Sequence, residues 1–113
     1  MRMNKTTEQS APILTARQKK FLKGLGHDLA PVILIGKEGM SDRLLGATDL
    51  ELARHELIKI RVGNNSGLEK NETANSLSAA TQSTLVQLLG KTILLYRRNP
   101  ELPKEKQLVL PKG

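Results

Sequence analysis

The sequence predicts a single α/β domain whose elements follow in the order αβαβαββ around a mixed sheet. Three observations lead to this prediction. Apolar residues recur with helical spacing in three stretches, and short β-type runs lie between them. The stretch "HELIKIRV", residues 55–62, changes from a helical period to strict alternation. The runs "TLVQLL" and "TILLYR" are separated only by Gly90 and Lys91, which indicates a two-residue hairpin.

The first predicted helix opens at Leu14, with Thr15 as its N-cap and Gln18 as the capping-box partner. It ends before Pro31. Its apolar side chains fall within one arc of about 100° and are expected to face the core: Leu14, Phe21, Leu22, Leu25 and Leu29. Its basic side chains fall on the opposite side and are expected to face solvent: Arg17, Lys19, Lys20 and Lys23. Residues 1–12 are polar and are expected to form a flexible tail.

The first predicted strand, residues 32–35, is continuously apolar and is expected to be central in the sheet. A second helix follows, with Ser41 as its N-cap and an apolar face of Leu44, Leu45, Thr48 and Leu52. The alternation in the next strand turns Ile58, Ile60 and Val62 to one side and Lys59 and Arg61 to the other.

The second half of the chain begins with the predicted loop "GNNSG", residues 63–67. A third helix is expected between residues 69 and 81, with Thr73, Ala74, Leu77 and Ala80 on its apolar face. The hairpin comes next, and the domain is expected to span residues 13–98. Residues 99–113 contain three prolines and are expected to form a tail, with a short edge strand at residues 107–110.

The formal net charge of +7 is concentrated at the two ends of the sequence. Residues 1–43 carry eight basic and four acidic side chains, and residues 91–113 carry six and two. Such an excess suggests a polyanionic partner, most often nucleic acid, although many basic proteins are merely soluble. Without cysteine the chain has no disulfides and no thiolate metal ligands. It shows neither a secretory signal nor an apolar run of membrane-spanning length, so a cytoplasmic protein is expected.

Two short motifs resemble enzyme signatures, and both are incomplete. The "GKT" at residues 90–92 would need glycine at position 85 and a following helix to form a phosphate-binding loop, but Leu85 stands there and a strand follows. The "HE" at residues 55–56 would need histidine at position 59 to form a zinc protease site, but the residue is Lys59. We therefore expect no enzyme, no metal and no cofactor.

The stretch Gly36-Lys37-Glu38-Gly39 joins the first strand to the helix that begins at Ser41. Glycines allow close approach of another backbone, and the N–H groups at a helix start suit phosphate oxygens. A GxxG loop opening a helix is also how KH domains clamp nucleic acid. An ordinary tight turn is the alternative interpretation of the same residues.

Three segments, in this order and spacing, resemble the CRM domain, the chloroplast RNA splicing and ribosome maturation module: residues 14–42, "HELIKIRV" and "QLLGKTILLYRR". The similarity is greatest to the stand-alone bacterial form, the YhbY family, and covers about residues 14–98. The resemblance implies a four-stranded mixed sheet similar to the C-terminal domain of bacterial translation initiation factor three. It implies binding to ribosomal RNA or its precursor during large-subunit assembly. It also implies the RNA-binding residues: Gly36, Lys37, Glu38, Gly39, Ser41, Arg17, Lys19, Lys20, Lys23, Lys91 and Arg97.

The only aromatic residues are Phe21 and Tyr96, so base stacking on sheet aromatics is nearly unavailable. Recognition of RNA backbone and shape is therefore expected, by a monomer that binds no small molecule. The alternative function is a protein-interaction module that docks on an acidic ribosomal or translation factor. The charge distribution alone does not distinguish this function from RNA binding.

Overall fold

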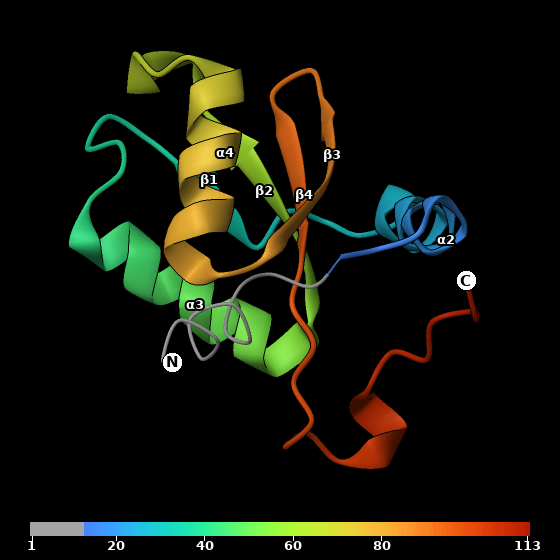
Figure 1. Ribbon diagram of the computed structural model, residues 1–113. Helices are drawn as coiled ribbons and strands as arrows, with labels where there is room; N and C mark the ends of the chain where they lie inside the picture. Colours follow the sequence, from blue (N-terminus) through green and yellow to red (C-terminus); the bar gives the residue numbers. More distant parts are fainter. Residues whose placement is uncertain (1–12) are drawn as a thin grey trace, which may run out of the picture.

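A mixed four-stranded sheet separates one helix from two others in the computed structural model, which describes residues 13–113 (Figure 1). The strand order is β1-β2-β4-β3, with β1 at Ile33–Ile35, β2 at Leu57–Val62, β3 at Thr84–Leu89 and β4 at Thr92–Tyr96. Helix α2 (Ala16–His27) lies against one face, and α3 (Asp42–His55) and α4 (Lys70–Thr81) cover the other. The predicted element order and mixed sheet are confirmed. The predicted tail at residues 1–12 lies outside the described residues.

Strand β2 is central, parallel to β1 and antiparallel to β4. Its residues Ile58, Ile60 and Val62 are almost fully buried in the core beneath α3 and α4. Lys59 and Arg61 point to the opposite face, where α2 lies. The predicted alternation is therefore confirmed, and it sets which side of β2 enters the larger core.

The prediction that residues 32–35 form a central strand is wrong. Strand β1 lies at the edge of the sheet and pairs only with β2. Ile33 and Ile35 are buried under α3, whereas Leu34 is 65% exposed on the other face. β4 pairs with the other edge of β2, which leaves β1 with a single neighbouring strand.

Helix α2 begins with the predicted capping box, in which Thr15 and Gln18 exchange hydrogen bonds at 3.1 Å. Only Leu22 and Gly26 are buried in this helix, because these two positions, four residues apart, face the sheet. The prediction that Phe21, Leu25 and Leu29 face the core is wrong, since their side chains are 38%, 39% and 38% exposed. Lys19 is half-buried rather than fully solvent-facing.

Helix α4 buries the predicted Thr73, Ala74 and Leu77. The prediction for Ala80 is wrong, since it is exposed and Thr81 is buried in its place, with its hydroxyl donating to the Leu77 carbonyl at 2.8 Å. The hairpin prediction is confirmed, because Leu89 pairs with Thr92 and Gly90 adopts φ 58° in the turn between them. The predicted loop at residues 63–67 contains a single 3₁₀ turn, η1 (Asn64–Ser66).

Residues 107–110 do not form the predicted edge strand, and a buried carboxylate binds the backbone of this segment instead. Glu56, 1% exposed, accepts the backbone N–H of Asn99 at 2.6 Å and that of Leu108 at 2.7 Å. Leu108 and Leu110 then pack against the smaller core on the α2 side. Burial, and after it the negative charge of Glu56, raises the pKa of Tyr96 above its usual value. A second 3₁₀ turn, η2 (Lys104–Lys106), lies within this segment.

The two glycines of α2 should respond oppositely to alanine. A Cβ at Gly24 would meet open space, so Gly24→Ala should raise the free energy of unfolding by about 0.5–1 kcal/mol through helix propensity. A Cβ at Gly26 would lie 2.6 Å from Cδ2 of buried Leu94. Gly26→Ala should therefore lower the free energy of unfolding, since overpacking typically costs about 1–3 kcal/mol.

Urea unfolding of both variants beside the parent checks this pair. Equal stability of the two variants would show that α2 does not depend on close approach at Gly26.

Candidate nucleic-acid interface

Residues Gly36–Gly39, here called the glycine loop, make a tight turn between β1 and α3. The Gly39 N–H donates to the Gly36 carbonyl at 3.0 Å. Gly39 adopts φ 65°, a left-handed conformation that favours glycine. Gly36 lies outside that region, and a Cβ there would have no atom within 4 Å. The turn therefore requires glycine at position 39, whereas neither backbone conformation nor packing requires it at position 36.

The start of α3 remains open to an anion. Its cap is neutral, since the Ser41 hydroxyl oxygen accepts the Leu44 N–H at 3.1 Å. In the part of the chain that the structure describes, no acceptor reaches the N–H groups of Asp42 and Arg43. Such unpaired groups carry the partial positive charge of the helix terminus.

The start of α4 is closed by the protein's own carboxylate. Glu69 accepts the N–H groups of Glu72 at 2.9 Å and Asn71 at 3.1 Å. The bond from Glu72, and next that from Asn71, hold the pKa of Glu69 below its usual value. Of these two helix starts near the glycine loop, only that of α3 has unpaired N–H groups for an outside anion, although the Asp42 carboxylate in its first turn lowers the attraction.

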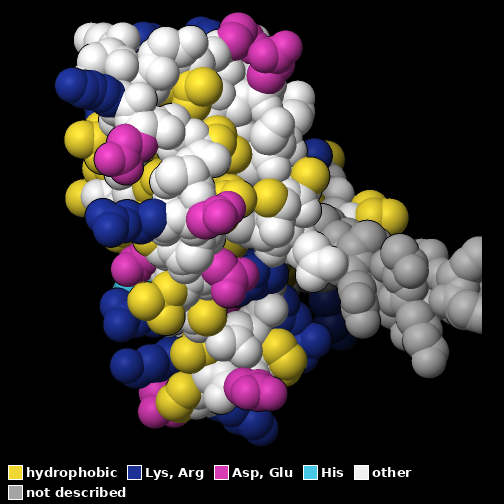
Figure 2. All heavy atoms as spheres, turned by 90° about the vertical axis from the view of Figure 1, so that its left-hand side faces the viewer, with side chains coloured by type: hydrophobic (Ala, Val, Ile, Leu, Met, Phe, Trp, Pro, Cys, Tyr) yellow, Lys and Arg dark blue, Asp and Glu magenta, His cyan; other side chains and the backbone are white. Residues whose placement is uncertain are grey.

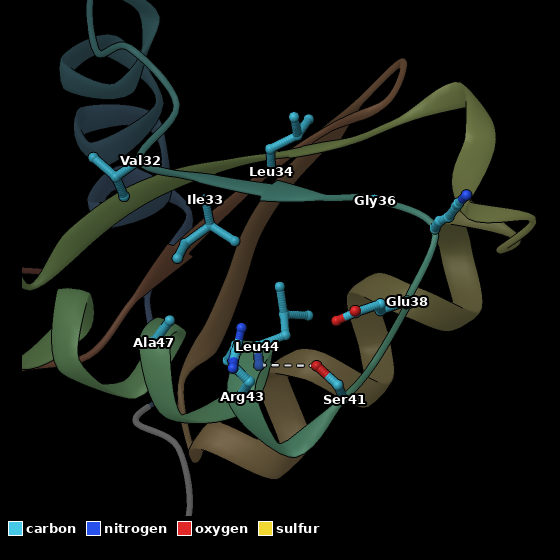
Figure 3. A pocket seen from close by; sticks show the side chains of 11 residues that line it. Val32, Ile33, Leu34, Gly36, Glu38, Ser41, Arg43, Leu44 and Ala47 are labelled. Carbon is cyan, nitrogen blue, oxygen red and sulfur yellow. Dashed lines mark hydrogen bonds between the residues drawn. The ribbon is translucent and has the colours of Figure 1, made fainter.

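A groove of about 560 Å³ runs between β1 and α3 and ends at the glycine loop (Figure 3). Ile33 points down into it toward α3, whereas Leu34 points away to the other side of the strand. Glu38 points into the groove and Arg43 lines it from the first turn of α3. The groove thus combines an apolar floor with one acidic side chain, Glu38, and two basic side chains, Lys37 and Arg43.

Hydrogen bonds bring two further loops beside the glycine loop. The Gly63 N–H donates to the Ile35 carbonyl, and the Val62 N–H to the Lys91 carbonyl, both at 2.8 Å. The Lys91 ammonium group donates to the Asn64 side chain at 2.8 Å. We call the three segments 36–39, 63–68 and 90–91 the loop cluster, which occupies one end of the sheet (Figure 1). Predicted residue Lys91 therefore lies at the same end of the molecule as Lys37.

The basic side chains of α2 do not join the loop cluster. Arg17, Lys20 and Lys23 are exposed on a helix that lies across the sheet from α3 (Figure 1). The predicted site residues therefore divide into two groups, one on each side of the sheet. A ligand that contacts both must be large enough to reach around the sheet end.

Predicted site residue Arg97 is held within the fold. Its guanidinium donates to the Thr81 carbonyl at 2.9 Å, to the Asp49 carbonyl at 3.1 Å and to the Asp49 carboxylate. These bonds join the end of β4 to α3 and to the end of α4. The guanidinium thus has a structural role that its sequence position did not reveal.

Arg43 and Arg61 are two cations that sequence reasoning did not include in the site. Arg43 lies in the first turn of α3, and its position two residues after the cap could have indicated that it borders the glycine loop. Arg61 is exposed on β2 opposite Leu34 of β1. Its place in the strand alternation was predicted, but its neighbours depend on strand order.

Charges are mixed on the side of the molecule that carries the glycine loop and α3 (Figure 2). Lysine and arginine side chains gather along one edge of this view, and acidic side chains lie between them as well as over the rest. Among the described residues, no group of histidine and carboxylate side chains could hold a metal ion. No helix in residues 13–113 is long and apolar enough to cross a membrane.

The architecture and the loop cluster place the protein among small α/β domains that present a glycine loop at the start of a helix. Residues 14–97 match the CRS1 / YhbY (CRM) domain. The chain therefore belongs to the CRS1/YhbY (CRM) domain family, as its sequence resemblance indicated.

Relatives with similar sequences carry RNA-binding names. The protein named "Probable RNA-binding protein YqeI" from Bacillus subtilis is 38% identical over 99 residues, which cover 88% of this chain and all of the relative. A Haemophilus influenzae protein named "RNA-binding protein" is 36% identical over 88 residues, covering 78% of this chain and 89% of the relative. The solution structure of hypothetical protein SAV1595 from Staphylococcus aureus is 38% identical, with a TM-score of 0.71 over 88% of this chain and all of that one.

Arg97→Ala should destabilise the fold. It leaves the part-buried Thr81 carbonyl without this donor, and hydrogen bonds to charged groups contribute about 1.5–3 kcal/mol. The pair with Asp49 should add little, because that carboxylate is 61% exposed. Thermal unfolding measures the loss, and Arg98→Ala, at an exposed neighbour, should melt like the parent. Parental melting of Arg97→Ala together with weakened RNA binding would assign the guanidinium to RNA instead.

Proposed function

We propose that this protein binds RNA, with the sugar-phosphate backbone packed against the glycine loop and the start of α3. The observation that carries the proposal is the bare backbone at Gly36. Nothing in the fold requires glycine at this position, since a side chain would meet open space and the backbone is not left-handed. A partner that approaches the backbone closely explains the missing side chain.

The surroundings of Gly36 suit a phosphate group. The α3 start supplies unpaired N–H groups, and Lys37 and Arg43 supply formal positive charge. Two carboxylates oppose them: Glu38 points into the groove, and Asp42 lies in the first turn of α3. The net attraction at the loop is therefore modest, and further cations must contribute to affinity.

Helix α2 supplies those further cations in this proposal. Arg17, Lys20 and Lys23 are exposed across the sheet from α3. A folded RNA is wide enough to contact both groups, whereas a short single strand lying on one face is not. Tyr96 is buried and Phe21 is the other aromatic residue, so contact with the RNA backbone should provide most of the affinity.

Ribosomal RNA of the large subunit, or its precursor, is the target that the family resemblance favours, and the proposal includes it. Crosslinking in cells followed by sequencing of the attached RNA tests the target. Large-subunit sequences should dominate, and their absence would overturn this part. A complex that survives nuclease treatment unchanged would favour the alternative, a protein partner.

Gly36→Asp and Gly36→Asn should separate a phosphate contact from an ordinary turn. Both side chains fit the open space at position 36, so both variants should melt within a few degrees of the parent. Asp places a carboxylate where phosphate is expected, and Asn has the same size without charge. RNA affinity, measured by filter binding, should fall about tenfold or more for Asp and considerably less for Asn, since charge-assisted contacts are the stronger ones.

Glu38→Gln provides the opposite change in charge and should bind RNA more tightly than the parent. Equal affinity of the parent, Gly36→Asn and Gly36→Asp would mean that the glycine loop is only a turn.

The affinity should fall steeply with salt. If about five phosphates are neutralised, log K should fall against log salt with a slope of about −3.5 to −4.5. Replacing Arg17, Lys20 and Lys23 together with alanine should flatten the slope by about one unit per lost phosphate contact. Alanine at Lys104, Lys106 and Lys112 removes the same charge elsewhere and should keep the parental slope. Equal slopes for the two triple variants would exclude α2 from the interface.

A further inference from the structure

Helix α2 leaves part of its sheet face uncovered. At one end of that face Leu57, Val86, Leu94 and Tyr96 are buried against Leu22 of α2. Toward the loop cluster the next positions on the same face are open. One residue from each strand forms a row across the sheet: Leu34 pairs with Arg61, Arg61 with Thr92, and Thr92 with Leu89. We call these four residues the open row.

The open row combines exposed aliphatic side chains with an unpaired cation. Leu34 is 65% exposed and Leu89 is 68% exposed, one on each edge strand. Arg61 lies between them, and its guanidinium has no hydrogen-bond or ion-pair partner among the described residues. The row spans three strand spacings, about 14 Å in all. Exposed leucines on edge strands invite unwanted association, so their presence favours a function at this place.

A small hollow adjoins the open row and adds positive charge. It has a volume of about 200 Å³, lies between the end of α2 and the sheet, and shares Leu89 and Thr92 with the row. Lys23, His27 and Lys59 also line it. None of the four strands contains an acidic residue. The exposed face therefore presents flat apolar surface beside cations with no opposing carboxylate on the strands.

The open row is continuous with the loop cluster. Leu34 precedes Gly36 by two residues on β1, and Leu89 precedes Lys91 by two residues at the hairpin. An RNA strand that contacts the glycine loop therefore reaches the row by passing around the end of β1 to the other face of the sheet.

We propose that the open row binds unpaired nucleobases of RNA. This proposal rests on RNA binding by the glycine loop and extends it from the sugar-phosphate backbone to the bases. The Arg61 guanidinium stacks on a base, as arginine planes do in single-stranded RNA recognition. Leu34 and Leu89 contact the flanking base faces, and Lys23 and Lys59 attract the phosphates. The chemistry of the row thus supplies the stacking that the buried Tyr96 does not.

Two RNA hairpins test this proposal, one with a fully paired stem and one with a three-nucleotide bulge in the same stem. The parent should prefer the bulged RNA. Arg61→Lys keeps the positive charge and removes the planar guanidinium that stacks on a base. It should therefore reduce the preference for the bulged RNA by about tenfold, the size of effect expected for losing one stacked base. Its affinity for the paired hairpin and its salt slope should match the parent. Leu34→Thr and Leu89→Thr, which keep good strand formers, should act in the same direction.

Arg98→Lys is the matched control at an exposed arginine outside the row and should keep the parental preference. Melting curves check folding, and Arg61→Lys decides the question if a leucine variant unfolds. An unchanged preference in Arg61→Lys, or equal losses on both hairpins, overturns the proposal while RNA binding stands. Failure of the parent to bind either hairpin overturns both proposals. If the protein instead captures a protein partner in a complex that resists nuclease, and if this capture requires Leu34 and Leu89, the open row binds protein.

Discussion

The alternation along β2 is the constraint on which the other parts of the structure depend. This strand is the only one bonded to both β1 and β4, so its two faces define the two sides of the domain. Ile58, Ile60 and Val62 fill one side, which α3 and α4 then cover. Lys59 and Arg61 occupy the other side and limit how far an apolar helix face can extend over it. A shift of one residue in register would exchange these sets and bury two cations.

Three glycines at the edges of this arrangement show how the same residue type serves different needs. Gly26 allows α2 to approach Leu94, and Gly39 provides a left-handed turn. Gly36 has neither purpose within the fold. Since a glycine without an internal role increases the entropy of the unfolded chain and so lowers stability, its presence is most simply explained by something outside the fold.

Local physics made much of the fold predictable. The capping box of α2, the Ser41 cap, the β2 alternation and the Gly90–Lys91 turn each depend on residues close in sequence, and each is confirmed. The glycine loop was predictable as a unit for the same reason. Strand order was not, because a continuous apolar run looks alike at the centre and at an edge. The bonds of Arg97 and the neighbours of Arg61 join segments far apart in sequence, so no local pattern contains them.

The carboxylate of Glu56 has a consequence for the order in which this protein can form. Both of its acceptor bonds end on residues more than forty positions later in the chain, Asn99 and Leu108. Until those residues exist, the carboxylate must remain hydrated or be buried without partners, which is costly. Proteins are synthesised from the N-terminus, so the second bond to the Glu56 carboxylate forms only after Leu108 has been added. The nascent chain can pair β1 and β2 early, but Leu108 packs against the smaller core on the α2 side only at this later stage.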